Sequence, residues 1–379
     1  MQDGSRIEAA LARAVTGGLP GVAVAALTPD GQVVEAAAGV RGLDNPAPMT
    51  SDTVFWIASF TKAITTAAVL QLVERGRVRL DDPVGRWLPG LADPMVLKGF
   101  DDAGAPVVAP AIGRITVRHL LAHTSGLAYD FCNAQLARWR AWAAGEGAAA
   151  GSDAPLMFEP GAGWTYGVGL DCAGELVAAL TGRTLDVYLA DEVFGPLGMG
   201  ETGWAPGEAQ ATRKASMHAR ADDGSLAPIP FALPPAPNPA MGGGGLYSTA
   251  GDYLKFLRAI LSGGGPILGP ASVALMSRGD EWEGAEVGVL AAVNARLCAG
   301  FDPFPGKAKR WSLGFAVNPE PGPAGRSAGS LAWAGLGNCY YWADPARRVA
   351  GVFLAQLLPF GDAAALEAFG DFERAVYEA

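Results

Sequence analysis

The chain has 379 residues, of which 50% are hydrophobic and 17% are charged. This length and composition allow a large core and roughly two to three structural units. A net charge of −10 without a basic run argues against nucleic acid as a partner, and an anionic membrane would repel the chain. No stretch is long and apolar enough to cross a bilayer.

The N-terminus and the cysteines predict a cytoplasmic protein. Met1–Leu11 is acidic and helix-like, without a basic segment leading into an apolar core. Cys132, Cys172, Cys298 and Cys339 are widely spaced and form no C-x-x-C pair. They therefore fit reduced core thiols better than disulfides or a zinc site.

Two β-hairpins are predicted, one near each end of the chain. The first joins Gly21–Leu27 to Gln32–Ala38, and the second joins Asn338–Ala343 to Val349–Ala355. The final segment, Ala363–Ala379, has a helical pattern. Strands at both ends of a chain are typical of one sheet built from both termini.

The middle of the chain has more helix-like patterns and long loops than the two ends. We therefore expect an α/β (α+β) fold in which residues 1–80 and 221–379 form an antiparallel sheet flanked by helices. Residues 81–220 would form an inserted, mainly helical domain, and the active site would lie between the two. Pro228–Pro239, with six prolines, reads as a rigid loop returning to the sheet.

The stretch Ser59-Phe60-Thr61-Lys62 opens an apolar helical pattern that we expect to run from about Ser59 to Arg75. It places a hydroxyl and an amine on one helical face, beside the positive end of the helix dipole. If packing desolvates Lys62, its pKa would fall toward roughly 7–8 and the neutral amine could accept the serine proton. A capping serine before a solvated lysine is the alternative, and the short pattern alone leaves it open.

A turn-rich segment, Pro160–Gly169, leads to Tyr166 and then into a predicted helix, Leu170–Leu180. A tyrosine in this place could act as a phenolate or a proton relay. No other of the six lysines has a serine three residues before it. Together these features favour a serine nucleophile that needs no histidine.

Several motifs in order resemble the serine β-lactamase and penicillin-binding protein superfamily and, within it, the class C-like esterases called family VIII carboxylesterases. Besides the S-x-x-K motif and Tyr166, the resemblance includes Ile115–Leu127, which looks like that family's "LLxHTSGL" segment, then Gly242–Thr249 and Trp333–Gly335. It covers nearly the whole chain. It implies a serine β-lactamase/transpeptidase-like fold, Ser59, Lys62 and Tyr166 as catalytic residues, and an oxyanion hole made by the backbone N–H groups of Ser59 and Leu336.

Departures from the class C β-lactamase pattern bear on the substrate. Where those enzymes have Tyr-x-Asn the chain has Val168, and where they have Lys-Thr-Gly it has Trp333-Ala334-Gly335. A neutral, apolar acyl group suits such a pocket better than an anionic one. Tyr129, Val168, Trp333 and Gly335 are the candidate substrate-binding residues, although both aromatic residues could equally be core packing.

Three other motifs could indicate a different nucleophile, a metal site or a phosphate site. Gly325-Arg326-Ser327-Ala328-Gly329 matches the G-x-S-x-G pattern of α/β-hydrolases, but every histidine precedes Ser327. His119 and His123 lack the glutamate of a zinc H-E-x-x-H motif, and Gly242–Gly245 lacks the ending of a phosphate loop. We therefore expect a structural histidine pair, a close backbone approach beside the site, and neither a metal nor a cofactor.

The sequence thus predicts a serine carboxylesterase that hydrolyses small to medium acyl esters through a Ser59 acyl-enzyme, with Lys62 and Tyr166 as a coupled general base and acid. Which of the two is the neutral base stays open. Alternatives are an acyltransferase of the lovastatin-synthesis type, a β-lactamase or D-amino-acid peptidase, and a penicillin-sensor-like binding module. Arg326, Arg347 or Arg348 could supply the cation that lactam hydrolysis would use. The expected partner is a small-molecule ester, and the oligomeric state stays open.

Overall fold

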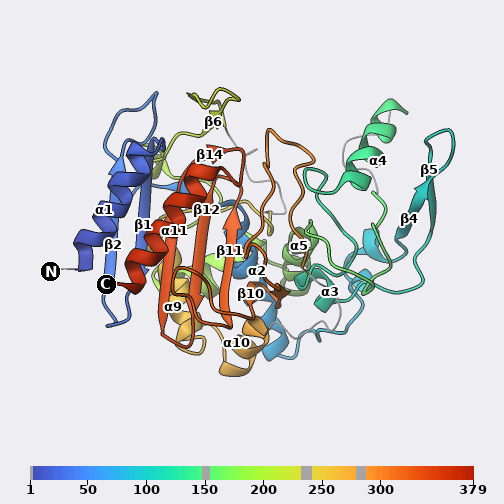
Figure 1. Ribbon diagram of the computed structural model, residues 1–379. Helices are drawn as coiled ribbons and strands as arrows, with labels where there is room; N and C mark the ends of the chain where they lie inside the picture. Colours follow the sequence, from blue (N-terminus) through green and yellow to red (C-terminus); the bar gives the residue numbers. More distant parts are fainter. Residues whose placement is uncertain (1–2, 147–153, 232–240, 279–286) are drawn as a thin grey trace.

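A seven-stranded sheet forms the centre of the molecule in the computed structural model, which describes residues 3–146, 154–231, 241–278 and 287–379 (Figure 1). The strand order is β2-β1-β13-β12-β11-β10-β9, and each neighbouring pair is antiparallel. The strands are β1 (Gly21–Leu27), β2 (Val33–Gly39), β9 (Arg310–Trp311), β10 (Ala316–Asn318), β11 (Ser330–Gly335), β12 (Cys339–Asp344) and β13 (Val349–Leu354). The predicted antiparallel sheet is confirmed.

Both predicted hairpins are present in this sheet. In the first, Gly21 faces Gly39 and Leu27 faces Val33. In the second, β12 and β13 pair in the same antiparallel manner. Strand β1 also pairs directly with β13, so segments from the two ends of the chain lie side by side in the sheet.

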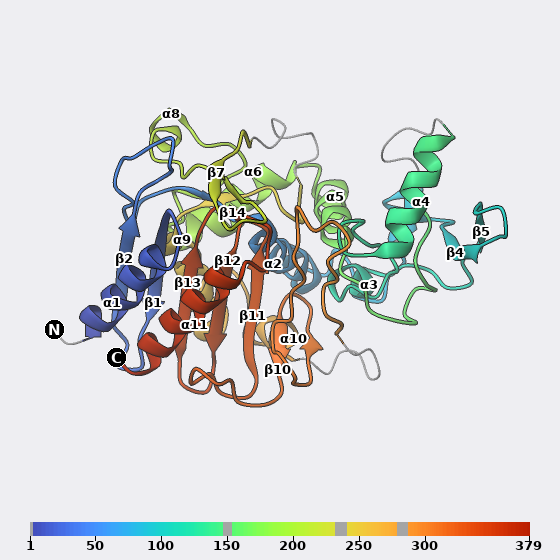
Figure 2. The same ribbon diagram turned by 45° about the horizontal axis from the view of Figure 1, so that its top comes forward.

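Helices cover both faces of the sheet. Helices α1 (Asp3–Thr16) and α11 (Ala363–Tyr377) pack side by side on one face, whereas α2 (Thr61–Glu74) and α9 (Ala250–Leu261) lie behind the other (Figure 1, Figure 2). Both faces being covered explains why every residue of β11, β12 and β13 is buried. The predicted C-terminal helix is α11.

The remaining elements surround the central sheet and the helices that cover it. The helices are α3 (Val117–Leu121), α4 (Ala134–Gly145), α5 (Gly169–Thr181), α6 (Leu185–Leu189), α7 (Gly195–Leu197), α8 (Glu208–Ala211) and α10 (Pro270–Ser277), with short turns η1 (Ala58–Phe60), η2 (Val84–Arg86), η3 (Pro89–Leu91) and η4 (Ala190–Phe194). The small strands are β3 (Phe55–Trp56), β4 (Met95–Phe100), β5 (Pro106–Pro110), β6 (His218–Arg220), β7 (Leu226–Pro228), β8 (Tyr247–Ser248) and β14 (Leu357–Leu358). Helix α4 and the β4–β5 hairpin lie at the end away from the termini (Figure 2).

The segment from 81 to 220 is less purely helical than the sequence patterns suggest, because the β4–β5 hairpin lies within it. A domain division at residues 80 and 220 remains a prediction. The predicted Pro-rich loop Pro228–Pro239 falls mainly in residues 232–240, outside the described residues. None of the helices in the described ranges has the length and hydropathy that crossing a membrane requires.

All four cysteines are free thiols, as the sequence predicts.

Helix α2 is the central helix of the core. Every residue from Thr61 to Leu72 is buried, as expected for a helix that other elements surround on all sides. Two of its polar side chains donate to backbone carbonyls: the Thr65 hydroxyl donates to Gly242 O at 2.8 Å, and the Gln71 amide donates to Ile267 O at 2.9 Å. The helix begins slightly later than predicted, because Ser59 lies in the preceding turn η1.

The G-x-S-x-G motif has a structural role. It forms the approach to β11, where the Ser327 N–H donates to the Asp344 carboxylate at 2.9 Å and Ser327 O accepts from Asn318 Nδ2 at 2.8 Å. Strand β11 begins at Ser330 and ends at Gly335, about 17 Å away at the rise of an extended strand. Ser327 therefore lies at the opposite end of this strand from Leu336.

A buried ion pair fixes the same region to α11. Arg326 Nε lies 3.0 Å from Glu373 Oε1, a second guanidinium nitrogen contacts Oε2, and both side chains are less than a tenth exposed. Neutralising one partner leaves the other charge buried without its counter-ion.

We expect Glu373→Gln to lower the free energy of unfolding by about 3 kcal/mol or more, measured by urea titration. The double variant Arg326→Met/Glu373→Leu removes both charges and is expected to recover most of that loss. A Glu373→Gln protein as stable as the wild type would contradict this account.

Candidate active site

Ser59 lies in the turn that connects β3 to α2, and it lines a pocket. The residue before it, Ala58, has φ = 46°, a left-handed conformation that is unfavourable for alanine. Such strain is common where a backbone must present a reactive side chain. Lys62 follows one turn later, and its Nζ lies 3.2 Å from Ser59 Oγ.

The Lys62 amine has three hydrogen-bond contacts and is 1% exposed. Besides Ser59, Nζ contacts Tyr129 Oη at 3.1 Å and Gly243 O at 2.6 Å. The amine also lies 5.0 Å from the ring centre of Tyr129 and 4.8 Å from that of Tyr166. Burial lowers the pKa of Lys62 to about 8, although the Asp171 carboxylate opposes this shift.

These contacts fit a neutral amine. A neutral lysine has two N–H donors and one lone pair. Gly243 O can accept one N–H, and Tyr129 can accept the other because its own O–H donates to Asp171 Oδ2 at 3.2 Å. The lone pair then remains for the Ser59 proton.

Tyr166 is the second tyrosine beside Lys62, and its ring centre lies 5.4 Å from that of Tyr129. Its Oη accepts a hydrogen bond from Trp333 Nε1 at 3.1 Å. Burial raises the pKa of Tyr166, and hydrogen bonds with Ser59 and Trp333 oppose that shift only in part. At neutral pH Tyr166 is therefore a protonated phenol.

The segment that resembles the "HTSGL" motif positions both tyrosines. His123 O accepts from the N–H of Thr165, and Tyr166 O accepts from the N–H of Tyr129 at 3.1 Å. His119 caps α3 by exchanging hydrogen bonds with Thr116, and the His123 ring packs 4.9 Å from that of Tyr166. The histidines thus belong to the frame around the tyrosines.

The end of β11 lies directly against the turn that carries Ser59. A Cβ at Gly335 would lie 2.4 Å from Ile57 O, so only glycine permits this approach. Leu336 and Ser59 consequently line the same pocket. This proximity suits the predicted pair of oxyanion-hole N–H groups.

The pocket beside Ser59 has a volume of about 160 Å³ and is mainly apolar. Its larger side chains are Trp56, Tyr129, Phe131, Tyr166, Met241, Leu290, Trp333, Leu336 and Phe360. Tyr129, Trp333 and Gly335 line it as predicted, whereas Val168 does not. Val168 instead precedes α5, where its carbonyl accepts from the N–H of Asp171.

The three arginines considered as replacement cations lie elsewhere. Arg326 is paired with Glu373, and Arg347 and Arg348 lie in the turn between β12 and β13, beyond the Leu331–Ala343 pair. This turn is at the opposite end of β11 from Gly335. Among the residues that the structure describes, none that lines the pocket is charged.

Asp171 is the part of the site that sequence reasoning missed, and its partner Gly243 was predicted only as a member of the glycine run Gly242–Gly245. Asp171, in the first turn of α5, accepts from the Gly243 N–H at 2.9 Å and from the Tyr129 hydroxyl. A Cβ at Gly243 would lie 2.4 Å from Asp171 Oδ2, which explains a glycine here. The glycine run Gly242–Gly245 was the sequence signal for this contact, because it predicted a close backbone approach beside the site, and the structure has such an approach at Gly243.

A serine, a desolvated lysine and a tyrosine between an antiparallel sheet and helices define the class of β-lactamase-fold serine hydrolases and acyltransferases. The Beta-lactamase family model matches residues 6–374, and the chain belongs to this family. The superfamily resemblance seen in the sequence is thereby confirmed.

The proteins to which this chain is similar include a transferase, an esterase and a synthase. Monacolin J acid methylbutanoyltransferase of Aspergillus terreus is 34% identical over 343 residues, covering 87% of this chain and 83% of the relative. Lovastatin esterase of Penicillium rubens is 36% identical over 272 residues, covering 68% of each chain. The unliganded simvastatin synthase of Aspergillus terreus superposes with a TM-score of 0.85 at 31% identity, covering 100% of this chain and 98% of that one.

Because Asp171 raises the pKa of Lys62 against the effect of burial, we expect Asp171→Asn to move that pKa below about 8. The titration can be followed by ¹³C NMR of labelled lysine side chains. Asp186→Asn, an exposed carboxylate on α6, is the control and should leave the Lys62 midpoint unchanged. An unchanged or raised midpoint in Asp171→Asn would refute this electrostatic coupling.

Proposed function

We propose that this protein is a serine carboxylesterase of the family VIII type that hydrolyses small to medium acyl esters through a Ser59 acyl-enzyme. The observation that carries the proposal is the buried Lys62 amine within hydrogen-bond distance of Ser59 Oγ, at the edge of an apolar pocket. A solvated lysine after a capping serine would have neither this burial nor these contacts.

In acylation, Ser59 Oγ attacks the ester carbonyl carbon while neutral Lys62 accepts the serine proton. Lys62 is the base because its pKa is about 8, whereas burial keeps Tyr166 protonated. The Lys62–Tyr166 pair returns the proton to the departing alkoxide as the bond between carbonyl carbon and alkoxy oxygen breaks. The N–H groups of Ser59 and Leu336 stabilise the oxyanion.

In deacylation, water takes the place of the alcohol. It loses a proton to Lys62 while its oxygen attacks the acyl carbon, and the bond to Ser59 Oγ breaks as that oxygen regains a proton. The pair of residues thus works in both directions, as double displacement requires.

The pocket supports a neutral acyl group of limited length. An apolar cavity of about 150 Å³ holds a benzene molecule, and this pocket has about 160 Å³. An acyl group of about four to six carbons is of that size. Trp333 in place of a lysine, and the absence of charge among the described lining residues, disfavour an anionic β-lactam.

An acyltransferase is the second candidate, with an alcohol replacing water as the acceptor. It is favoured by the transferase relative, whose name specifies a five-carbon methylbutanoyl group, whereas the lovastatin esterase relative supports hydrolysis.

The carboxylesterase proposal includes a small-molecule ester as the partner and a cytoplasmic location. The four free thiols support that location.

The decisive assay compares p-nitrophenyl butyrate with a chromogenic cephalosporin. We expect fast ester turnover, slow or no lactam opening, loss of turnover in Ser59→Ala, and losses of at least about a hundredfold in Lys62→Ala and Tyr166→Phe. Ser327→Ala is the matched serine control and should retain activity. Dominant lactam opening would favour the β-lactamase alternative over the esterase proposal. Full activity in Ser59→Ala would exclude Ser59 as the nucleophile.

The pH dependence tests which residue is the base. Since catalysis needs neutral Lys62 and its pKa is about 8, kcat/KM for p-nitrophenyl butyrate should rise as pH increases and level off above about 8. Lys62→Ala should lose this rise after correction for spontaneous hydrolysis. A wild-type profile that is flat from pH 6 to 9 would show that Lys62 is not the titrating base.

A further inference from the structure

A second cavity borders the active-site pocket. Its volume is about 220 Å³, and Met217, Ile229 and Phe231 contribute apolar side chains to its wall. Among the residues that the structure describes, Trp56 alone lines both this cavity and the pocket beside Ser59. A single residue therefore marks the boundary between the two spaces.

The side chain of Trp56 forms this boundary. Its Nε1 donates to Gly244 O at 2.7 Å, and Gly244 lines the active-site pocket. Its ring centre lies 4.6 Å from that of Phe231, which lines the second cavity. The indole is 6% exposed and contacts one wall residue of each space. It therefore occupies the volume between the two cavities.

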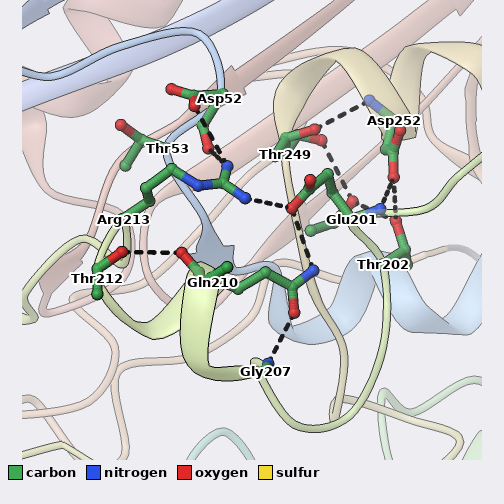
Figure 3. A network of polar contacts seen from close by, with 12 residues as sticks. Asp52, Thr53, Glu201, Thr202, Gly207, Gln210, Thr212, Arg213, Thr249 and Asp252 are labelled. Carbon is green, nitrogen blue, oxygen red and sulfur yellow. Dashed lines mark hydrogen bonds and ion pairs between the residues drawn. The ribbon is translucent and has the colours of Figure 1, made fainter.

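The backbone holds this indole in a fixed position. Within the pairing of β3 with β8, the N–H of Trp56 donates to Gln356 Oε1 at 3.2 Å, and its carbonyl accepts from Gln356 Nε2 at 3.0 Å. The segment just before β3 is held by ion pairs of Arg213 with Asp52 at 3.4 Å and with Glu201 at 2.7 Å (Figure 3). The ring thus projects from backbone that polar contacts fix on several sides.

We propose that Trp56 limits the length of the acyl group, because its indole closes the active-site pocket toward the second cavity. The inference rests on the proposed ester hydrolysis and names the residue that sets its chain-length preference. With the indole in place, the acyl group is confined to a pocket of about 160 Å³. Without it, the joined space would be more than twice as large, since the second cavity adds about 220 Å³.

The far side of the boundary suits the end of an alkyl chain. Met217 and Tyr247 belong to the same hydrophobic cluster as Trp56, and Ile229 and Phe231 pack against it. A longer acyl chain that reached these side chains would leave water for apolar surroundings, which favours binding. Removing the indole should therefore shift the preference toward longer acyl groups.

The test compares p-nitrophenyl butyrate with p-nitrophenyl octanoate. Each methylene that leaves water favours binding about fourfold, so burial of two more methylenes gives a factor above ten. We expect Trp56→Ala to raise the ratio of kcat/KM for the octanoate to kcat/KM for the butyrate at least about tenfold. Trp56→Leu, a smaller change in the core, should raise it in the same direction. An unchanged ratio in a variant that folds, as judged by near-UV circular dichroism, would overturn the proposal.

Opposite changes at Ile229, which lines the second cavity and not the active-site pocket, are the matched controls. Ile229→Ala enlarges the second cavity behind an intact Trp56 and should leave the ratio unchanged. Ile229→Trp in the Trp56→Ala background refills that cavity and should return the ratio toward the wild-type value. A raised ratio in Ile229→Ala alone would show that the indole does not separate the two spaces.

Calorimetry distinguishes this proposal from the proposed function. Ethyl octanoate, titrated into Ser59→Ala/Trp56→Ala, should bind with a Kd about tenfold lower than in Ser59→Ala. If the wild type hydrolyses neither p-nitrophenyl ester, the esterase proposal fails, whereas the titration still decides whether Trp56 limits chain length. Equal Kd values in the two variants would exclude Trp56 as that limit.

Discussion

The burial of Lys62 is the constraint on which the site depends. Because other elements surround α2 on all sides, its first turn has no access to bulk water, and the ammonium loses much of its solvation. The same burial would be costly without partners, and Gly243 O, Tyr129 and Ser59 supply them. The reactivity that we propose for Ser59 would therefore be a consequence of core packing around one helix.

Close backbone approaches make those partners available. Gly335 brings the end of β11 against the turn that carries Ser59, and Gly243 lies against Asp171 and Tyr129, so a side chain on either glycine would collide. The Asp171 carboxylate holds Gly243 and Tyr129 in place and moderates the effect of desolvation on Lys62. The site thus combines a lowered lysine pKa with a nearby charge that limits how far it falls.

Local patterns predicted the parts of the site that neighbouring residues determine. Ser59 and Lys62 are one helical turn apart, and both hairpins follow from alternating strands around short turns. Tyr129 was predicted only as a pocket wall, and its contact with Lys62 emerges from the fold. Asp171 and the β4–β5 hairpin were missed, and Val168 does not reach the pocket, because these placements depend on contacts between distant segments.

Trp333 links the choice of substrate to the choice of base. In the position where class C β-lactamases have a lysine, its indole is neutral, and no described residue that lines the pocket supplies a cation for an anionic acyl group. Its N–H donates to Tyr166 Oη, and a neutral donor stabilises a phenolate less than a nearby ammonium would. Burial therefore keeps the pKa of Tyr166 high, and Lys62, whose pKa is lowered, is our proposed proton acceptor. An indole in place of an ammonium therefore supports our proposal of a neutral ester as the substrate and of lysine as the base.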